Sequence, residues 1–245
     1  MNETERFAEE VAANIKSQGE DRDVQALSRI WVREVTRYRY GYNFNWMGRP
    51  IIQTPQDMVA LQEIVWRTRP DVVIETGIAH GGSLVYLASL MELLGGDGRV
   101  VGIDIEIRPH NRVEIEKHPM ARRVKLIEGS SADPVIVAQA TREISGKQRV
   151  MVILDSNHTL DHVRRELELY SPLVTKDCYL VVFDTLLEDM PADLQGSRPW
   201  GPGNGPKTAV HQFLALNKRF EIDRSIEHKL LITLAPDGYL RCIKD

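Results

Sequence analysis

Two aspartates and one histidine follow apolar runs that are typical of neighbouring strands. Asp155 and His158 lie in "VMVILDSNHT", and Asp184 ends the run in "CYLVVFDT". Paired carboxylates are the oxygen ligands that Mg²⁺ prefers, and a nearby imidazole can take a proton from a substrate hydroxyl. The three residues therefore indicate a divalent-ion site with His158 as general base. The alternatives are helix capping for the aspartates and a surface position at a helix start for His158.

A glycine-rich loop, "ETGIAHGGS" at residues 75–83, joins the first predicted sheet strand to the helix after it. The loop lacks the lysine of a phosphate-binding P-loop, and its glycines do not fit the dinucleotide pattern G-x-G-x-x-G. Its glycines let the backbone turn tightly and approach a ligand, and the first helix amides offer donors. An acid-x-glycine loop of this kind suits a ligand with an amino-acid tail, such as S-adenosylmethionine. The alternative is a tight turn without a ligand.

Two later strand ends could complete a nucleoside site. Asp104, in "VVGIDIEI", could accept hydrogen bonds from both ribose hydroxyls, or it could be a solvated strand-end carboxylate. Ser131, in "EGSSADP", could contact an adenine edge, although Asp133 could simply cap the next helix. The residues that we expect to bind the cofactor are Glu75, Thr76, Gly77, His80, Gly81, Ser83, Asp104, Ser131 and Asp155.

Short apolar runs alternate with helical patterns from Thr54 onward, which predicts an α/β fold with a parallel sheet and helices on both faces. Five runs end at Glu75, Asp104, Glu128, Asp155 and Asp184. Because ligands of open α/β sheets bind beyond the carboxyl ends of the strands, these acidic residues should line the binding crevice. Residues 220–244 predict two further strands, with a hairpin turn at "PDG" between "LLITLA" and "YLRCIK".

The first 50 residues differ from the rest of the chain. Residues 3–37 have a helical spacing of apolar side chains with a break near Gly19, and the aromatic stretch "RYRYGYNFNWMGRP" follows. We expect residues 1–50 to form a helical extension whose aromatic segment covers the active site or joins two subunits, and residues 51–245 to form the cofactor-binding domain. The loop 186–207 holds four Gly and four Pro, which is typical of a functional lid or a disordered segment.

Composition excludes some classes of partner. The 245 residues carry a formal net charge of −4, so the chain has no overall basic field for nucleic acid or an anionic membrane. No run approaches the roughly 18 apolar residues of a membrane span, and the first residues are acidic and polar, so we expect a cytoplasmic protein. Cys178 and Cys242 stand in apolar, strand-like surroundings, which indicates buried structural cysteines rather than a disulfide or a metal site.

Six motifs together resemble the cephalosporin hydroxylase and rhamnosyl O-methyltransferase-like family, from about Asn45 to the C-terminus. They are "NWMGRPIIQTPQDM", "IETGIAHGGS", "GIDIEIRPHNR", "LDSNHT", "VFDTLLED" and "GPGNGPKTAV". The resemblance implies a class I S-adenosylmethionine-dependent methyltransferase with a Rossmann-like α/β fold. Its sheet would have seven mostly parallel strands, the last one antiparallel, with helices on both faces. The resemblance also favours a homo-oligomer.

The resemblance implies roles for the residues at the ends of the fourth and fifth strands. Asp155 and Asp184 match aspartates that bind Mg²⁺, and His158 matches a histidine that acts as base, so we expect His158 and Asp155 to be catalytic. Where relatives have a glutamate just before the second aspartate, this chain has Phe183, which cannot bind a metal. The missing ligand would have to come from Thr185, Glu188, Asp189 or water, and we include Thr185 in the expected metal site.

The expected reaction is methylation of a hydroxyl group on a sugar or a glycosylated natural product, with S-adenosylmethionine as donor and Mg²⁺ as a possible aid. One alternative is N-methylation of an aminosugar, which needs a general base less and would tolerate the loss of an acid at Phe183. Another is a non-catalytic cofactor-binding partner of an oxygenase, although Asp155 and His158 would then have no purpose. The acceptor and the methylated position do not follow from the sequence.

Overall fold

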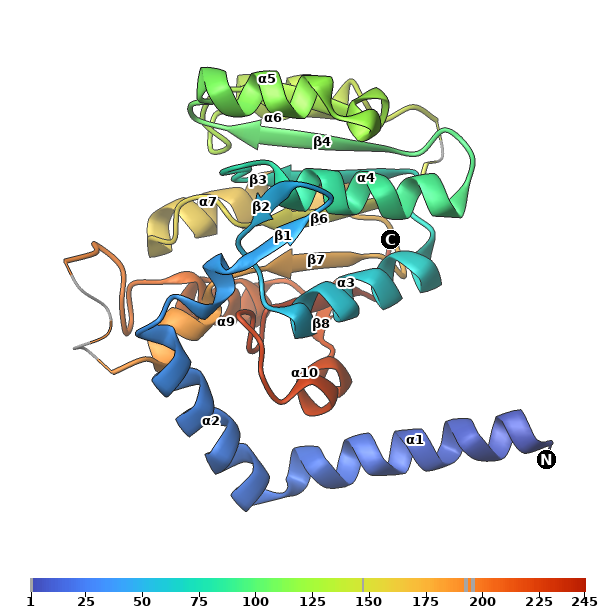
Figure 1. The fold of residues 1–245 in the computed structure, drawn as a ribbon, viewed down its shortest axis with the longest axis vertical. Helices are drawn as coiled ribbons and strands as arrows, with labels where there is room; N and C mark the ends of the chain where they lie inside the picture. Colours follow the sequence, from blue (N-terminus) through green and yellow to red (C-terminus); the bar gives the residue numbers. More distant parts are fainter. Residues whose placement is uncertain (1, 147, 192–193, 195–196) are drawn as a thin grey trace.

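The centre of the protein is a seven-stranded sheet in the order β5-β4-β3-β6-β7-β9-β8 (Figure 1). A computed structural model describes residues 2–146, 148–191, 194 and 197–245. The first five strands of that order are mutually parallel, and β9 is antiparallel to both of its neighbours. The predicted fold class is therefore confirmed. The strands are β3 Val72–Thr76, β4 Arg99–Asp104, β5 Val124–Glu128, β6 Val150–Leu154, β7 Tyr179–Val182, β8 Phe220–Ile222 and β9 Tyr239–Cys242.

Helices pack on both faces of the sheet. Because successive side chains of a strand point to opposite faces, Val73 joins the core cluster of α3 and α4, whereas Val72 and Ile74 join that of α6, α7 and α9. Cys178 and Cys242 are free and buried in the second cluster, as predicted. The helices of the sheet domain are α3 Pro55–Thr68, α4 Gly82–Leu94, α5 Pro109–Lys117, α6 Pro134–Thr141, α7 Leu160–Tyr170, α9 Pro206–Leu216 and α10 Arg224–Leu230. Short 3₁₀ helices are η2 Pro119–Arg123, η3 Ser171–Leu173 and η4 Thr185–Asp189.

Local sequence signals determine where these helices begin and end. Thr54 caps α3 by accepting a hydrogen bond from Asp57 N, and Pro55 occupies the first helical position. Gly95 follows the last residue of α4 with a φ of 77°. Asp133 accepts a hydrogen bond from Val135 N and thereby caps α6, which was the alternative considered for this residue. Thr54 and Asp133 thus fix where α3 and α6 begin, and Gly95 fixes where α4 ends.

The predicted hairpin between "LLITLA" and "YLRCIK" is wrong. The strand β8 lies earlier, at Phe220–Ile222, and the helix α10 stands between it and β9. Asp223 starts that helix by accepting a hydrogen bond from Ser225 N. The following residues are bound elsewhere, because Leu234 N donates to the buried carboxylate of Asp57 in α3. A tertiary contact therefore overrides the apolar run that predicted a strand.

The buried carboxylate of Asp57 fastens the C-terminal segment to α3. It accepts hydrogen bonds from Leu234 N at 2.8 Å and from Tyr239 Oη at 2.7 Å, and Thr54 and Thr233 donate to it as well. Burial raises the pKa of Asp57, and these donors oppose the rise. Thr54, Thr233 and Leu234 also line a pocket described below, so this polar cluster holds one wall of that pocket.

The N-terminal residues form two helices and a hairpin outside the sheet. The helices are α1 Glu3–Glu20 and α2 Arg22–Thr36, and Asp21 caps the second, close to the predicted break near Gly19. After the short helix η1 Tyr40–Tyr42, β1 Phe44–Trp46 pairs with β2 Arg49–Ile51, so the boundary predicted after residue 50 falls inside β2. The N-terminal part of α1 extends away from the body, and the rest of the helix packs against α10, where Gln18 donates to the Lys229 carbonyl (Figure 1). None of the described helices is long and apolar enough to cross a membrane.

Candidate active site

Asp155, His158 and Asp184 converge at the carboxyl edge of the sheet. β6 and β7 are adjacent parallel strands, so the residues that follow them emerge side by side. One ligand atom of each residue lies within 4.8 Å of those of the other two. His158 Nε2 is 3.1 Å from Asp184 Oδ2, with the two side chains 14% and 26% exposed. The structure therefore brings together the three residues that the sequence predicted would meet.

Negative charge accumulates around Asp155. Burial, and next the charge of Asp184, raise the pKa of the Asp155 carboxyl well above its ordinary value. Gln53 Nε2 donates to Asp155 Oδ2 at 3.3 Å, which only partly compensates for the lost hydration. A cation placed between these carboxylates would relieve both the repulsion and the desolvation. Two carboxylates and an imidazole form a donor set that fits a divalent ion.

The residues named as possible replacements for the missing glutamate are engaged elsewhere. Phe183 is 1% exposed and packs edge-to-face on Tyr239, so it belongs to the core. The buried Thr185 donates its hydroxyl to the Pro236 carbonyl at 2.6 Å. Glu188 accepts a hydrogen bond from Thr208 N, and Asp189 forms an ion pair with Lys207. Among the described residues, Asp155 and Asp184 are therefore the carboxylates that this site offers to an ion, with the His158 imidazole beside them.

The glycine loop is built for close backbone approach. Gly77 has a φ of 80°, and a Cβ there would lie 2.0 Å from the Asp155 carbonyl. A Cβ on Gly82 would lie 2.1 Å from the Pro50 carbonyl. Ile78 N donates to Asp104 Oδ2 at 2.9 Å, which joins the loop to the end of β4. Side chains at these glycines would push the loop away from the Asp155 turn and from the N-terminal hairpin.

A pocket of about 230 Å³ lies between this loop and the acidic rim. Five of the predicted cofactor residues line it, namely Gly77, His80, Ser83, Asp104 and Asp155. Glu75 and Thr76 are buried at the end of β3, and Gly81 packs on Ile115. Ser131 instead lies 3.1 Å from His162 Nε2. The pocket also includes Gly82 of the glycine loop and Tyr42 of the aromatic stretch. Residues that the sequence did not single out are Pro50, Ile52, Gln53, Ile78, Ala79 and Ser156.

Two buried polar atoms support a ligand in this region. Gln53 Oε1 and Glu75 Oε2 have no hydrogen-bond partner among the described residues. Burial raises the pKa of Glu75 to about 8, and the hydrogen bond with Ser83 only partly opposes the rise. Buried polar atoms are nearly always paired in folded proteins. Gln53 lines the smaller pocket, and Glu75 is buried on the strand that leads into its glycine loop, so these unpaired atoms fit a site for the charged amino-acid tail of S-adenosylmethionine.

A hydrogen-bonded cluster behind the pocket was not predicted. Ser156, directly after Asp155, donates to the fully buried Glu166 at 2.8 Å, and His162 Nε2 lies 3.1 Å from the hydroxyls of both Ser156 and Ser131. His162 and Glu166 are four residues apart on α7 and therefore share one helix face. That spacing was the only sequence signal for the cluster. It ties the loop after β5 to the turn after β6.

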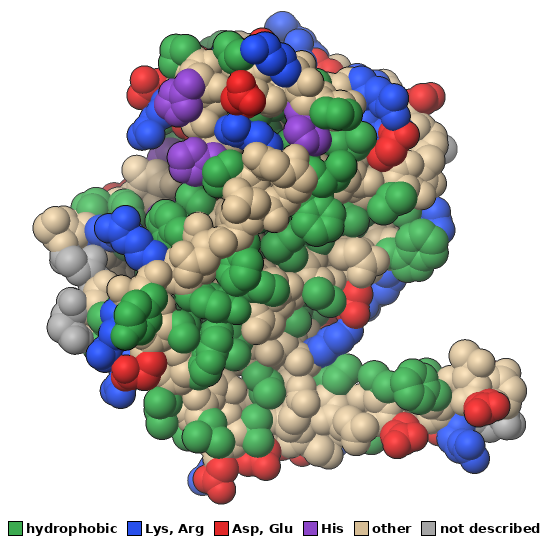
Figure 2. Space-filling model, in the orientation of Figure 1, with side chains coloured by type: hydrophobic (Ala, Val, Ile, Leu, Met, Phe, Trp, Pro, Cys, Tyr) green, Lys and Arg blue, Asp and Glu red, His purple; other side chains and the backbone are tan. Residues whose placement is uncertain are grey.

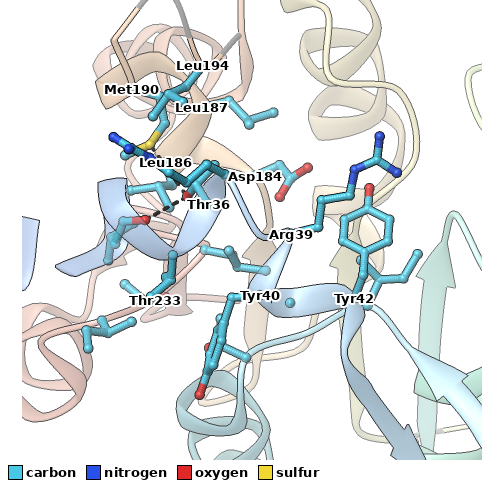
Figure 3. A pocket seen from close by; sticks show the side chains of 18 of the residues that line it. Thr36, Arg39, Tyr40, Tyr42, Asp184, Leu186, Leu187, Met190, Leu194 and Thr233 are labelled. Carbon is cyan, nitrogen blue, oxygen red and sulfur yellow. Dashed lines mark hydrogen bonds between the residues drawn. The ribbon is translucent and has the colours of Figure 1, made fainter. Parts of the chain in front are cut away.

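A second, larger pocket of about 440 Å³ adjoins the first (Figure 3). The two pockets share Tyr42, Ile52 and Asp184, so Asp184 stands at their junction. The Trp200 ring lines the larger pocket and meets the His158 imidazole edge-on, with 5.2 Å between ring centroids. Of the long loop predicted at 186–207, residues 192–193 and 195–196 lie outside the described part. The geometry therefore provides two adjoining chambers with the His158–Asp184 pair between them.

Residues 38–243 match the family Rhamnosyl O-methyltransferase/CmcI. The chain belongs to this family. A rhamnosyl O-methyltransferase of Mycobacterium tuberculosis (strain ATCC 25618 / H37Rv) is 35% identical over 219 residues, covering 84% of this chain and 83% of the relative. One from Mycobacterium leprae (strain TN) is 33% identical over 218 residues, covering 84% and 88%. The predicted family is thereby confirmed, and the protein is an S-adenosylmethionine-dependent methyltransferase.

Solved structures share the fold at low sequence identity. An apo structure of CmcI-N160 gives a TM-score of 0.58 at 18% identity, covering 83% of this chain and 78% of that chain. A cmcI-D160 structure with Mg and SAM gives 0.57 at 17% identity, with the same coverage. The O-methyltransferase from Bacillus cereus in complex with SAH gives 0.52 at 17% identity, covering 79% and 81%. The architecture of the sheet and its helices is therefore that of these proteins.

The raised pKa of Glu75 predicts a pH-dependent stability. In the ligand-free protein its carboxyl titrates at about 8, against 4.5 for an unperturbed glutamate. Between these two values the folded state holds a proton that the unfolded chain has lost. The contribution of Glu75 to the free energy of unfolding therefore declines as pH rises from about 4.5 to 8. We therefore expect the melting temperature of Glu75→Gln minus that of wild type to increase as pH rises from about 4.5 to 8. Glu114→Gln, at an exposed glutamate, is the control, and parallel curves for Glu75→Gln and wild type would contradict the assignment.

Proposed function

We propose that the protein methylates a hydroxyl group of a sugar or a glycosylated natural product. The observation that carries this proposal is the His158–Asp184 pair at the junction of two pockets, one beside the glycine loop and one open to an acceptor. The relatives at 33–35% identity are named rhamnosyl O-methyltransferases, which supports a sugar as acceptor. A deoxysugar such as rhamnose is the first acceptor to test.

The smaller pocket would hold the methyl donor. Asp104, which lines this pocket, would accept hydrogen bonds from the ribose hydroxyls, and the unpaired oxygen of the buried Glu75 would accept from the ammonium group of the amino-acid tail. His80 and Ser83 lie on the same loop and line the same pocket. We assign Thr76 and Gly81 to shaping the loop and Ser131 to the adenine side of the site, through its contact with His162.

His158 is the proposed general base. When bound, S-adenosylmethionine would supply the electrophilic methyl group, and Mg²⁺ would make the acceptor hydroxyl more acidic. The His158 imidazole would accept the proton that this hydroxyl releases, while its Nε2 faces Asp184. Asp184, 3.1 Å away, stabilises the imidazolium that forms, and the Trp200 ring restricts the imidazole from its other side. The reaction then needs little beyond alignment of the acceptor oxygen with the methyl carbon.

Asp155 and Asp184 are the proposed Mg²⁺ ligands. The raised pKa of Asp155 supports a cation at this place, because a positive charge would offset the burial of its carboxylate. Thr185 is less available as a metal ligand than we expected, because its hydroxyl donates a hydrogen bond to the Pro236 carbonyl. With Phe183 in place of an acid, water would complete the coordination shell, as is usual for Mg²⁺. N-methylation of an aminosugar, which needs a base less, is the second candidate because of Phe183.

Replacing His158 tests whether this residue acts as a general base or as a metal ligand. We expect His158→Ala to lower turnover of a rhamnoside about 100-fold or more, the range for loss of a general base, with little change in S-adenosylmethionine affinity. Calorimetry should show Mg²⁺ binding retained in His158→Ala and lost in Asp184→Ala. His211→Ala is a matched control, because His211 Nε2 also lies 3.1 Å from an aspartate, Asp237, away from the site. Full turnover in His158→Ala, or methylation of an aminosugar alone, would contradict the O-methylation mechanism.

The N-terminal helix supports a further proposal, that the protein self-associates. The described residues of α1 are all exposed or half-buried, and Phe7 is 66% exposed. Figure 2 shows apolar side chains along this helix and over α2. A helix with an uncovered apolar face needs a partner surface. Sedimentation equilibrium should give a multiple of 27.9 kDa, and Phe7→Glu should shift it toward the monomer, whereas a monomeric wild type would contradict the proposal.

A further inference from the structure

The larger pocket has two apolar walls that a bare sugar would not use. One wall is the inner side of α2, with Trp31, Val32 and Val35, and the other comes from η4 and the chain after it. Figure 3 shows Leu186, Leu187, Met190 and Leu194 gathered on one side of the pocket, with Tyr40 and Tyr42 on another. A sugar is a polyol, so burying its hydroxyls against such walls would cost free energy. Arg37, Arg39 and Arg198 also line the pocket and offer polar contacts, whereas the two apolar walls suit an apolar group.

α2 is held firmly enough to act as a wall. The Trp31 ring meets Tyr40 edge-on at 5.0 Å between centroids, and Tyr40 meets Phe44 in the same way at 5.0 Å. Phe44 in turn packs against the core of the sheet domain. Val32 is buried, and the Thr36 hydroxyl donates to the Met190 sulfur at 4.0 Å, which joins α2 to the chain after η4. This aromatic series links the helix to the body and gives the pocket a defined shape.

The pocket is continuous with the reaction centre through Asp184. A group held between α2 and η4 would therefore be attached to a sugar whose hydroxyl lies beside His158. The family match begins at residue 38, after α2 has ended at Thr36. The α2 wall is thus a feature of this chain that the family match does not cover.

We propose that α2 selects the acceptor, and that Trp31 and Val35 contact an apolar substituent carried by the methylated sugar. This inference rests on the proposed function. Trp31 and Val35 are four residues apart and so face the pocket together. An aromatic or alkyl substituent would displace water from both walls, and the sugar would remain at the polar junction. Trp31 is then a specificity residue rather than a catalytic one.

The test compares two acceptors, methyl α-L-rhamnopyranoside and its octyl counterpart, by kcat/KM. Burial of an alkyl chain between apolar walls predicts a preference of roughly tenfold or more for the octyl glycoside in wild type. We expect Trp31→Ala and Val35→Ser each to reduce that preference about fivefold or more, while kcat/KM for the methyl glycoside changes little. Leu27→Ala is the control, since Leu27 lies on α2, is 65% exposed and is not among the pocket-lining residues described.

The outcomes separate the two proposals. Equal use of both glycosides by wild type, or an unchanged preference in both variants, would overturn the role of α2 and leave sugar methylation standing. Methylation of neither glycoside by wild type would overturn sugar methylation and, with it, this inference. Val35→Ser keeps the test decisive if Trp31→Ala fails to fold, because Val35 takes no part in the aromatic series. Unchanged S-adenosylmethionine affinity in each variant verifies that the cofactor site is intact.

Discussion

The accumulation of carboxylates at the carboxyl edge of the sheet is the constraint on which the rest of the site depends. Parallel pairing of β6 with β7 forces Asp155 and Asp184 to emerge together, and β3 brings Glu75 to the same edge. Burial and like charge raise the pKa of Asp155. Such an arrangement is costly unless a cation occupies it. Both a divalent ion and a sulfonium carry the charge that this edge requires.

The glycine loop and η4 lie on either side of this acidic edge. The glycine loop crosses the Asp155 turn so closely that a side chain at Gly77 would collide with its carbonyl, which brings backbone amides to the cofactor side of the rim. On the other side, η4 begins at Asp184 and turns the chain into the wall of the larger pocket. Asp184 has a φ of 58°, a left-handed conformation that aspartate tolerates better than most residues. In the proposed mechanism, Asp184 thus serves the ion site, the base and the acceptor pocket.

The parts of this arrangement that depend on local sequence could be predicted. Apolar runs ending in acids indicated the sheet and its binding edge, and Thr54, Gly95 and Asp133 marked helix limits through side-chain and backbone chemistry. The C-terminal hairpin could not be predicted correctly, because the buried carboxylate of Asp57 binds the segment that resembles a strand. The acceptor pocket was equally hidden, since its walls come from α2, η4 and residues 232–234, which are far apart in sequence. Gln53 gave no signal, because its contact with Asp155 joins residues 102 positions apart.

The central claim is that the acidic edge and the glycine loop together form the methyl-donor site. Calorimetric titration of the purified protein with S-adenosylmethionine, after removal of metal and carried-over cofactor and then again with Mg²⁺, tests it most directly. The account predicts micromolar binding, weakened in Asp104→Ala, in which the carboxylate placed for the ribose is lost. No binding with or without Mg²⁺ would contradict the assignment of the smaller pocket and, with it, the mechanism built on His158 and Asp184.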